Sequence, residues 1–160
     1  MDRKNYRVHE PGIPNWSLEP WRPDETETLF DVHRRAMGPL VEQVWGWDDA
    51  DQRERFHDFL DPKMEKIVVG GEIVGMLDVD RADDGLFIGT IELIPEVQGR
   101  GLGSSILNSL LQEADAASVP VRLQVLKFNT RARRWYEALG FGITDETDTH
   151  HDMERLPRSR

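Results

Sequence analysis

The glycine-rich segment Gln98-Gly99-Arg100-Gly101-Leu102-Gly103 is the feature that most constrains what this chain can fold into. It follows an apolar run, residues 86–94, and precedes a stretch whose apolar residues repeat with helical spacing. The segment therefore lies where a strand turns into a helix. Glycines let the backbone approach a ligand closely, and the first amides of a helix point at a bound anion. This arrangement predicts a phosphate site that a pyrophosphate would fit.

The spacing of the glycines separates this loop from two other phosphate loops. A dinucleotide loop would need a further glycine at Ser104 or at Ile106, and neither position has one. A P-loop would need Gly-Lys-Ser or Gly-Lys-Thr, and the chain contains neither. The remaining pattern, Gln-x-x-Gly-x-Gly between a strand and a helix, closely resembles the acetyl-coenzyme A loop of the GNAT superfamily of N-acetyltransferases.

A second segment supports the same resemblance independently. Residues 129–141 are similar to the superfamily's N-x-x-A-x-x-x-Y-x-x-x-G-F pattern, with its asparagine at Asn129, its tyrosine at Tyr136 and its final pair at Gly140-Phe141. Two such segments at the proper separation identify the chain as a member of the GNAT superfamily.

The order of the expected elements agrees with this resemblance. Apolar periodicity and turn residues predict one strand, a helical layer, three antiparallel strands, and then helix, strand, helix and two strands. In that order the expected elements are a strand at 17–21, a helix from Asp24 that Gly38-Pro39 breaks, helical pieces at 40–45 and 56–60, strands at 66–69, 73–79 and 86–94, a helix at 102–117, a strand at 121–127, a helix at 130–139, and strands at 141–143 and 149–153. This is the GNAT fold, an α+β fold whose mixed, mostly antiparallel sheet is flanked by helices.

Two local signals refine that outline. Asp24 is a plausible cap of the first helix, with Glu27 three residues further on. Gly70-Gly71 between two strands predicts a tight hairpin.

Composition sets the outer limits. The 160 residues, 38% of them apolar, suit one domain, expected at 16–160 behind a mobile arm at 1–15. The absence of cysteine excludes a cysteinyl thioester, and no histidine and carboxylate cluster has metal-ligand spacing. No apolar run approaches the roughly 20 residues of a membrane span, and a net charge of −10 disfavours nucleic acid. We therefore expect a soluble, cytoplasmic protein with neither a membrane nor a nucleic-acid partner.

The resemblance implies acetyl-coenzyme A as the cofactor and a set of residues that bind it. Asn129 would contact the pantetheine or phosphate portion, and basic side chains at Arg100, Lys127, Arg131 and Arg134 are plausible partners of the phosphates. The cofactor-binding positions expected in this way are Leu93, Ile94, Gln98, Gly99, Arg100, Gly101, Leu102, Gly103, Ser104, Asn129, Arg131 and Tyr136.

Acetyl transfer to an amine requires an oxyanion donor and a group that protonates the leaving thiolate. By analogy with the superfamily, the backbone N–H of Leu93 is the expected oxyanion donor. Tyr136 is the expected general acid, because a phenol is chemically matched to a thiolate. The alternative for Tyr136 is a core tyrosine beside Ala132 and Leu139.

The general base is open among three residues. Glu92 is the first candidate, because it directly precedes the position expected to contact the acetyl group; it could equally be a solvent-facing strand glutamate. His33 lies on the apolar face of the first helix, where a half-buried, satisfied histidine is the alternative. His150 lies on a final strand that can border the acceptor site in this fold.

The segment 41–48 carries two tryptophans among carboxylates. Trp45, Trp47 and Glu42 would suit an organic cation through cation–π and charge pairing, in a region that forms the acceptor wall in this superfamily. The alternative is that both indoles are core or cap residues.

The sequence thus predicts an enzyme that transfers acetyl from acetyl-coenzyme A directly to an amine in a ternary complex. The acceptor, a small molecule or a peptide, is not specified, and a homodimer is possible in this superfamily. A non-catalytic acyl-coenzyme A binder is the alternative from another class. An unrelated phosphate-binding α+β domain is disfavoured by the segment 129–141.

Overall fold

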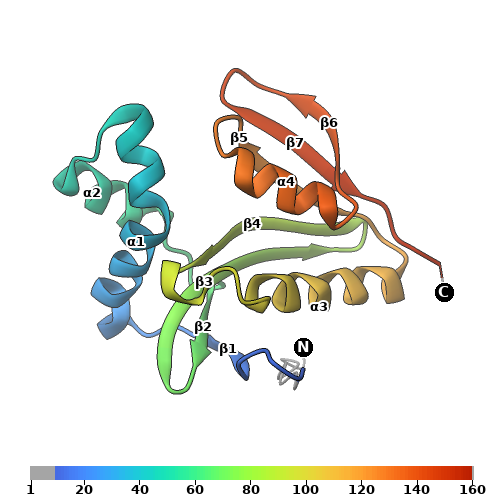
Figure 1. Ribbon diagram of the computed structural model, residues 1–160, viewed down its shortest axis with the longest axis horizontal. Coiled ribbons are helices and arrows are strands. Elements are labelled where there is room, and N and C mark those ends of the chain that lie inside the picture. Colours follow the sequence, from blue (N-terminus) through green and yellow to red (C-terminus); the bar gives the residue numbers. More distant parts are fainter. Residues whose placement is uncertain (1–9, 160) are drawn as a thin grey trace. The chain divides into compact units, whose positions relative to one another are not determined.

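The computed structural model describes residues 10–159 (Figure 1). Residues 1–9 of the expected arm lie outside the described residues. Just after them, the Ile13 N–H donates to the Glu10 carbonyl at 3.1 Å. Along the chain the elements, with short 3₁₀ helices labelled η, are β1 (Trp16–Pro20), η1 (Pro23–Glu25), α1 (Thr26–Trp45), α2 (Asp49–Phe59), β2 (Glu65–Val69), β3 (Glu72–Ala82), β4 (Gly85–Leu93), η2 (Pro95–Val97), α3 (Leu102–Ala117), β5 (Val121–Leu126), α4 (Thr130–Ala138), β6 (Gly142–Glu146) and β7 (His150–Arg155).

The strands form one mixed sheet in the order β1-β2-β3-β4-β5-β7-β6. β4 and β5 pair in parallel over Leu86–Ile88 and Val121–Leu123, and β4 continues for several residues beyond Ile88. The pairs β1–β2, β2–β3, β5–β7 and β6–β7 are antiparallel. A mixed, mostly antiparallel sheet with helices confirms the predicted fold class.

The chain divides into two compact units. The first unit comprises the residues up to Asp78 together with Thr90–Ile106, and the second comprises Val79–Gly89 with the residues from Leu107 onward. Strands β3 and β4 and helix α3 each contribute to both.

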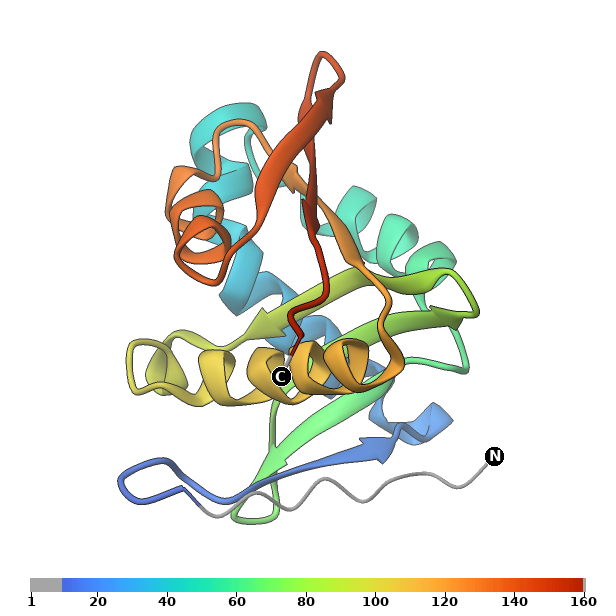
Figure 2. The ribbon, with the colours of Figure 1, turned by 90° about the vertical axis from the view of Figure 1, so that its right-hand side faces the viewer.

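The first unit contains the hairpin that the sequence predicts. Gly70 and Gly71 connect β2 to β3 with φ angles of 59° and 80°, so both residues of the two-residue turn are left-handed, as glycine allows (Figure 2). β1 pairs along β2, with Trp16 opposite Val69. The buried side chains of this unit include Trp16, Leu29, Phe30, Val32, Ile67, Met76 and Leu77.

Helix α1 runs without a break through Gly38-Pro39, so the predicted break is wrong. A proline disfavours helical backbone in the residue before it mainly through contact with that residue's Cβ and N–H. Gly38 has no Cβ, which removes part of that conflict. Gly38 is also buried, and the Trp47 ring lies over it, 3.9 Å from where a Cβ would be. Packing against this face therefore favours the continued helix over the local preference of proline.

The start of α1 also differs from the predicted capping by Asp24 and Glu27. Glu25 occupies the cap position, and its carboxylate accepts from the Arg22 N–H at 2.9 Å and from Lys66 Nζ at 2.7 Å. Hydrogen bonding from Lys66 is the largest influence that lowers the pKa of Glu25. Asp24 instead contacts the Arg22 guanidinium at the surface. Lys66, 41 positions further along the chain than Glu25, thus decides that Glu25 and not Asp24 turns inward.

In the second unit, α3 and strands β5 and β7 share a buried set of side chains that includes Leu107, Leu110, Ala114, Val121, Leu123 and Met153. Leu123 lies opposite Met153 in the β5–β7 ladder. β6 and β7 form the terminal hairpin, drawn in red (Figure 2). Within residues 10–159, no helix is long and apolar enough to cross a membrane.

A partly buried ion pair joins α3 to β7 in the second unit. The two terminal nitrogens of Arg155, whose side chain is 5% exposed, donate to the two carboxylate oxygens of Asp115 at 2.7 and 3.1 Å. The Arg158 N–H donates to the same carboxylate at 2.8 Å. Hydrogen bonding from Arg155 is the main cause of the lowered pKa of Asp115.

We expect Asp115→Asn to lower the free energy of unfolding by about 3 kcal/mol, because it leaves the Arg155 charge buried and unpaired. The folded-state pKa of Asp115 is depressed, so this stabilisation is present above the ordinary value of 3.8 and is lost as pH falls through the folded-state pKa. Urea denaturation of both proteins from neutral to acidic pH measures the effect. Asp148→Asn, at an exposed position, is the matched control and should change stability by less than about 0.5 kcal/mol. Equal stability of the two variants would contradict the assignment.

Candidate functional site

The predicted phosphate loop lies in the first unit between β4 and α3. After η2, Gly99 and Gly101 adopt left-handed φ angles of 73° and 83°. The Gln98 side-chain amide donates to the Leu93 carbonyl at 2.7 Å and so fixes the loop to the end of β4. The Ser105 N–H donates to the Gly101 carbonyl at 2.9 Å, at the first turn of α3. The glycine loop therefore leads directly into the first turn of α3, as the sequence predicts.

The residues of this loop fit a pyrophosphate. A Cβ built on Gly99 would meet nothing within 4 Å, so the space above the backbone there is open. Arg100 is exposed, and within residues 10–159 its guanidinium makes no ion pair or hydrogen bond. An open glycine backbone, a helix start and an unengaged cation together provide the donors that a phosphate anion needs.

Two of the residues considered as the base lie in direct contact. Nδ1 of His33, on α1, lies 3.1 and 3.0 Å from the two carboxylate oxygens of Glu92, on β4. The side chains of His33 and Glu92 are only 19% and 10% exposed. The sequence places these residues 59 positions apart and offers them as alternatives, whereas the structure joins them as a pair.

Aromatic rings surround the imidazole of His33. Phe56 of α2 stacks on it with centroids 5.3 Å apart and an interplanar angle of 23°. Trp47 and Phe59 lie at 6.2 and 6.4 Å. Sequence reasoning assigned no function to Phe56 and Phe59, and only their helical spacing drew attention to them. These rings fix the plane of the imidazole.

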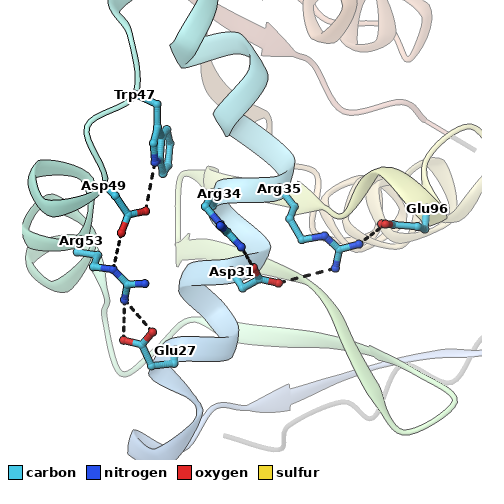
Figure 3. A network of polar contacts seen from close by, with 8 residues as sticks. All are labelled: Glu27, Asp31, Arg34, Arg35, Trp47, Asp49, Arg53 and Glu96. Carbon is cyan, nitrogen blue, oxygen red and sulfur yellow. Dashed lines mark hydrogen bonds and ion pairs between the residues drawn. The ribbon is translucent and has the colours of Figure 1, made fainter.

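The carboxylates near Trp47 already accept hydrogen bonds from the protein, which argues against their predicted role in a cation site. Glu42 accepts from the Trp47 backbone N–H at 2.7 Å. Asp48 caps α2 by accepting from the Asp51 N–H at 2.9 Å. Asp49 accepts from the Trp47 indole and from Arg53, which also binds Glu27 (Figure 3).

The same network continues along α1. Arg34 pairs with Asp31, and Arg35 bridges Asp31 and Glu96 of η2 (Figure 3). The acidic residues here hold α1, α2 and η2 in place. The predicted acceptor face thus presents the Trp47 indole more than free carboxylates. Trp45 is 60% exposed at the end of α1.

Close backbone packing sets the position of Glu92 on β4. A Cβ on Gly75 of β3 would lie 2.3 Å from the Glu92 backbone oxygen and 2.8 Å from Leu93 Cδ2. The Ile94 N–H donates to the Val74 carbonyl at 2.9 Å. Only glycine at position 75 allows this approach of β3 to the end of β4.

In the second unit, Tyr136 of α4 is buried, with 8% of its surface exposed. Its ring lies 5.0 Å from Trp135 and meets Phe141 edge-on at 5.7 Å. Burial raises the pKa of Tyr136 from 10.0 to about 12. Among residues 10–159 its hydroxyl has no hydrogen-bond partner, and it is not one of the fully buried polar atoms that lack one. The ring thus has core packing, and the hydroxyl keeps its donor capacity.

Several other predicted residues of the second unit have local partners. The Asn129 side chain caps α4 by accepting from the Ala132 N–H at 3.2 Å, a role that the sequence analysis missed. Lys127 pairs with Glu146 at 3.2 Å. His150 Nδ1 contacts the Thr149 hydroxyl at 2.7 Å. Arg131 and Arg134 are exposed on α4. Their predicted roles toward a cofactor or an acceptor stay predictions.

The comparison with protein families agrees with this fold and loop. The chain belongs to the acetyltransferase (GNAT) family, whose model matches residues 16–141. Acetyl-coenzyme A is accordingly its cofactor, as the sequence analysis expected, and acetyl transfer is its general activity. No curated protein matches the chain.

Solved structures share the fold at low sequence identity. The chain is similar to the PaiA N-acetyltransferase of Thermoplasma acidophilum in complex with coenzyme A, with a TM-score of 0.71, 16% identity and coverage of 88% of this chain and 98% of that one. An acetyltransferase of Thermus thermophilus has a TM-score of 0.69 and 21% identity, with coverage of 88% of this chain and 96% of that one. Arabidopsis thaliana Naa50, in complex with the bisubstrate analogue CoA-Ac-MVNAL, has a TM-score of 0.57 and 18% identity, with coverage of 88% of this chain and 97% of that one.

We predict that Gly75→Ala lowers the free energy of unfolding by about 1–3 kcal/mol, because the added methyl overlaps the Glu92 carbonyl. Gly142→Ala in β6 is the matched control, since a Cβ there meets nothing within 4 Å. Denaturant titration of both variants measures the difference. If Gly75→Ala were as stable as Gly142→Ala, the close approach of β3 to β4 would not exist in solution.

The buried phenol of Tyr136 predicts a distinctive alkaline titration. An unfolded tyrosine loses its proton near pH 10, whereas Tyr136 in the folded protein keeps it to about pH 12. Stability therefore falls as pH rises between these values, by up to about 3 kcal/mol, and Tyr136→Phe removes this part of the fall. Tyrosinate absorbance, compared between wild type and variant, follows the titration directly. Ionisation of Tyr136 at the ordinary pH would refute the assigned burial.

Proposed function

We propose that the protein is an N-acetyltransferase that transfers acetyl from acetyl-coenzyme A directly to an amine in a ternary complex. The observation that carries this proposal is the course of β4, which bears Glu92 in contact with His33 and then runs into the glycine loop within the same unit. A base and an anion site on one continuous segment suit proton removal beside a phosphate-bearing donor.

The proposed acceptor is a small-molecule or peptide amine. The similar structures from Thermoplasma acidophilum, an N-acetyltransferase, and from Arabidopsis thaliana, bound to a bisubstrate analogue with a peptide portion, support an amine. Because the carboxylates near Trp47 are engaged, its indole is the recognition element we assign to the acceptor, with His33 beside it. His150, Trp45 and Glu42 stay as secondary acceptor positions.

Each proposed role can be derived from the chain's own groups. Acetyl-coenzyme A, when bound, supplies the thioester carbonyl and the thiolate leaving group. The Leu93 N–H would donate to the carbonyl oxygen as negative charge develops on it. The chain has no cysteine to carry an acyl group, which supports direct transfer. Glu92, in contact with His33, is part of the pair that we propose as the base for the ammonium proton.

Tyr136 is the proposed general acid. Its hydroxyl is protonated at neutral pH and can donate to a developing thiolate, but the raised pKa makes it a weaker acid than an ordinary phenol. For the cofactor we propose Arg100 and the backbone of Gln98, Gly99, Gly101, Leu102, Gly103 and Ser104, with Leu93 and Ile94 before the loop and Asn129 and Arg131 in the second unit. The Ile94 N–H already donates to Val74, so Ile94 would contribute through its other atoms.

Thermal unfolding with and without excess acetyl-coenzyme A tests the cofactor site. A ligand at about 100 times its dissociation constant adds roughly 2.7 kcal/mol and raises the midpoint. We expect this shift from acetyl-coenzyme A but not from ADP or NAD. Arg100→Ala should reduce it, whereas Arg55→Ala, an exposed arginine on α2 paired with Asp51, should not. An equal shift from the control nucleotides would contradict the loop assignment.

Thiol release with a panel of amines then separates an enzyme from a non-catalytic binder. The panel comprises a polyamine, an amino-sugar antibiotic, a peptide with a free N-terminus and a lysine-containing peptide. We expect acceptor-dependent release that Tyr136→Phe reduces by about 10²–10⁴-fold while the acetyl-coenzyme A shift is kept. Binding without release with any amine would favour a binder or sensor. Unchanged rates in Tyr136→Phe would remove this residue as the acid.

A further inference from the structure

We propose that Nε2 of His33, rather than the Glu92 carboxylate, accepts the proton of the acceptor ammonium. Glu92 is then a positioning residue that holds His33. This inference rests on the proposed function, since it names the base of that same site. It changes the role that the sequence analysis gave to Glu92 and makes His33 catalytic.

The contact geometry argues for this division of roles. Nδ1 of His33 lies almost equally far, 3.1 and 3.0 Å, from the two oxygens of Glu92, so the imidazole engages the whole carboxylate. The Glu92 side chain is the more buried of the two, at 10% exposure against 19% for His33. The imidazole is therefore the more exposed member of the pair, and the carboxylate is the one that is held behind it.

The tautomer follows from the same contact. A carboxylate accepts hydrogen bonds, so the neutral imidazole must carry its proton on Nδ1. Nε2 is then left with a lone pair, and within residues 10–159 this nitrogen has no hydrogen-bond partner. A histidine held in one tautomer by a carboxylate, with its second nitrogen available, is the arrangement that general-base catalysis uses.

The aromatic rings hold the imidazole in that orientation. Phe56 stacks against one face, and Trp47 and Phe59 lie beside it. Phe56 is 2% exposed, which makes it a fixed support, whereas Phe59 is 40% exposed. The ring can therefore turn little about its side-chain bonds, and the direction of the Nε2 lone pair is set before an amine arrives.

Glu92 is the only charged group in hydrogen-bond contact with His33 among the described residues. On α1, Arg34 and Arg35 pair with Asp31, and Arg35 also reaches Glu96 of η2. On α2, Arg53 lies over Phe30 at 4.3 Å and pairs with Glu27 and Asp49. These neighbouring charges are thus matched within their own network.

The proposed step is balanced by a single proton. One N–H bond of the acceptor ammonium breaks, and a bond from that hydrogen to Nε2 of His33 forms. The nitrogen keeps the electron pair and becomes the nucleophile, and the imidazolium is stabilised by Glu92. Solvent removes the proton from His33 after transfer.

The tautomer of His33 in the wild-type protein is the first test, and it needs no acceptor. Nitrogen-15 correlation spectra distinguish the two neutral tautomers, and His33→Ala identifies which of the five histidines gives the signal. We expect the proton on Nδ1 in wild type and a mixture of tautomers in Glu92→Ala. A neutral His33 that carries its proton on Nε2 would overturn the proposal.

Chemical rescue of His33→Ala is the second test. With any amine of the panel that wild type acetylates, the variant should lose about 10²–10⁴-fold in kcat while its acetyl-coenzyme A thermal shift is kept. Added imidazole should restore a measurable part of kcat. Pyrazole, a ring of the same size and a much weaker base, should not. Equal rescue by both would show that His33 only fills space, and full activity of His33→Ala would show that it has no role.

A double-mutant cycle separates positioning from direct proton transfer by Glu92. If Glu92 acts only through His33, adding Glu92→Gln to His33→Ala should cause no further loss in kcat. Additive losses would return the base to Glu92. Failure of wild type to acetylate any amine would instead reject the proposed function, which distinguishes the two failures.

Discussion

The approach of β3 to β4 at Gly75 is the constraint on which the candidate site depends. No other residue leaves room for the Glu92 carbonyl at this point, and the hydrogen bond from Ile94 to Val74 holds the strands together just beyond it. The end of β4 is fixed from both sides, because Gln98 binds the Leu93 carbonyl from the loop. A rigid strand end positions the Glu92 carboxylate for His33 and begins the glycine loop at a defined place.

Local chemistry made much of the fold predictable from the sequence. Gly70-Gly71 can adopt left-handed φ angles at both positions of a tight turn without strain, and the glycine loop before an amphipathic helix leaves few alternatives. Pro39 and Asp24 were misjudged because distant contacts decide them. The Trp47 ring covers Gly38, and Lys66 draws Glu25 inward in place of Asp24. Propensity is a weak guide wherever such packing competes with it.

The candidate site was predictable as a set of residues but not as an arrangement. His33 and Glu92 were each recognised for their chemistry, yet nothing in the sequence indicates a contact across 59 positions. The carboxylates near Trp47 illustrate the opposite error. They suggested a cation site by composition, and their actual partners are backbone amides, an indole and Arg53 of α2. Carboxylates that already accept hydrogen bonds from neighbouring groups of the protein are not available to bind a ligand.

The paired arginines around α1 and α2 have a consequence for how ionic strength would act on this protein. Three arginines face four carboxylates there, so most of the local charge cancels, and a cationic amine is attracted mainly by the net charge of −10, spread over the whole chain. Ions at physiological concentration screen such attraction beyond about 8 Å. The sheltered contact between His33 and Glu92 is screened much less. Added salt would therefore slow the encounter with the amine and leave the proton transfer almost unchanged.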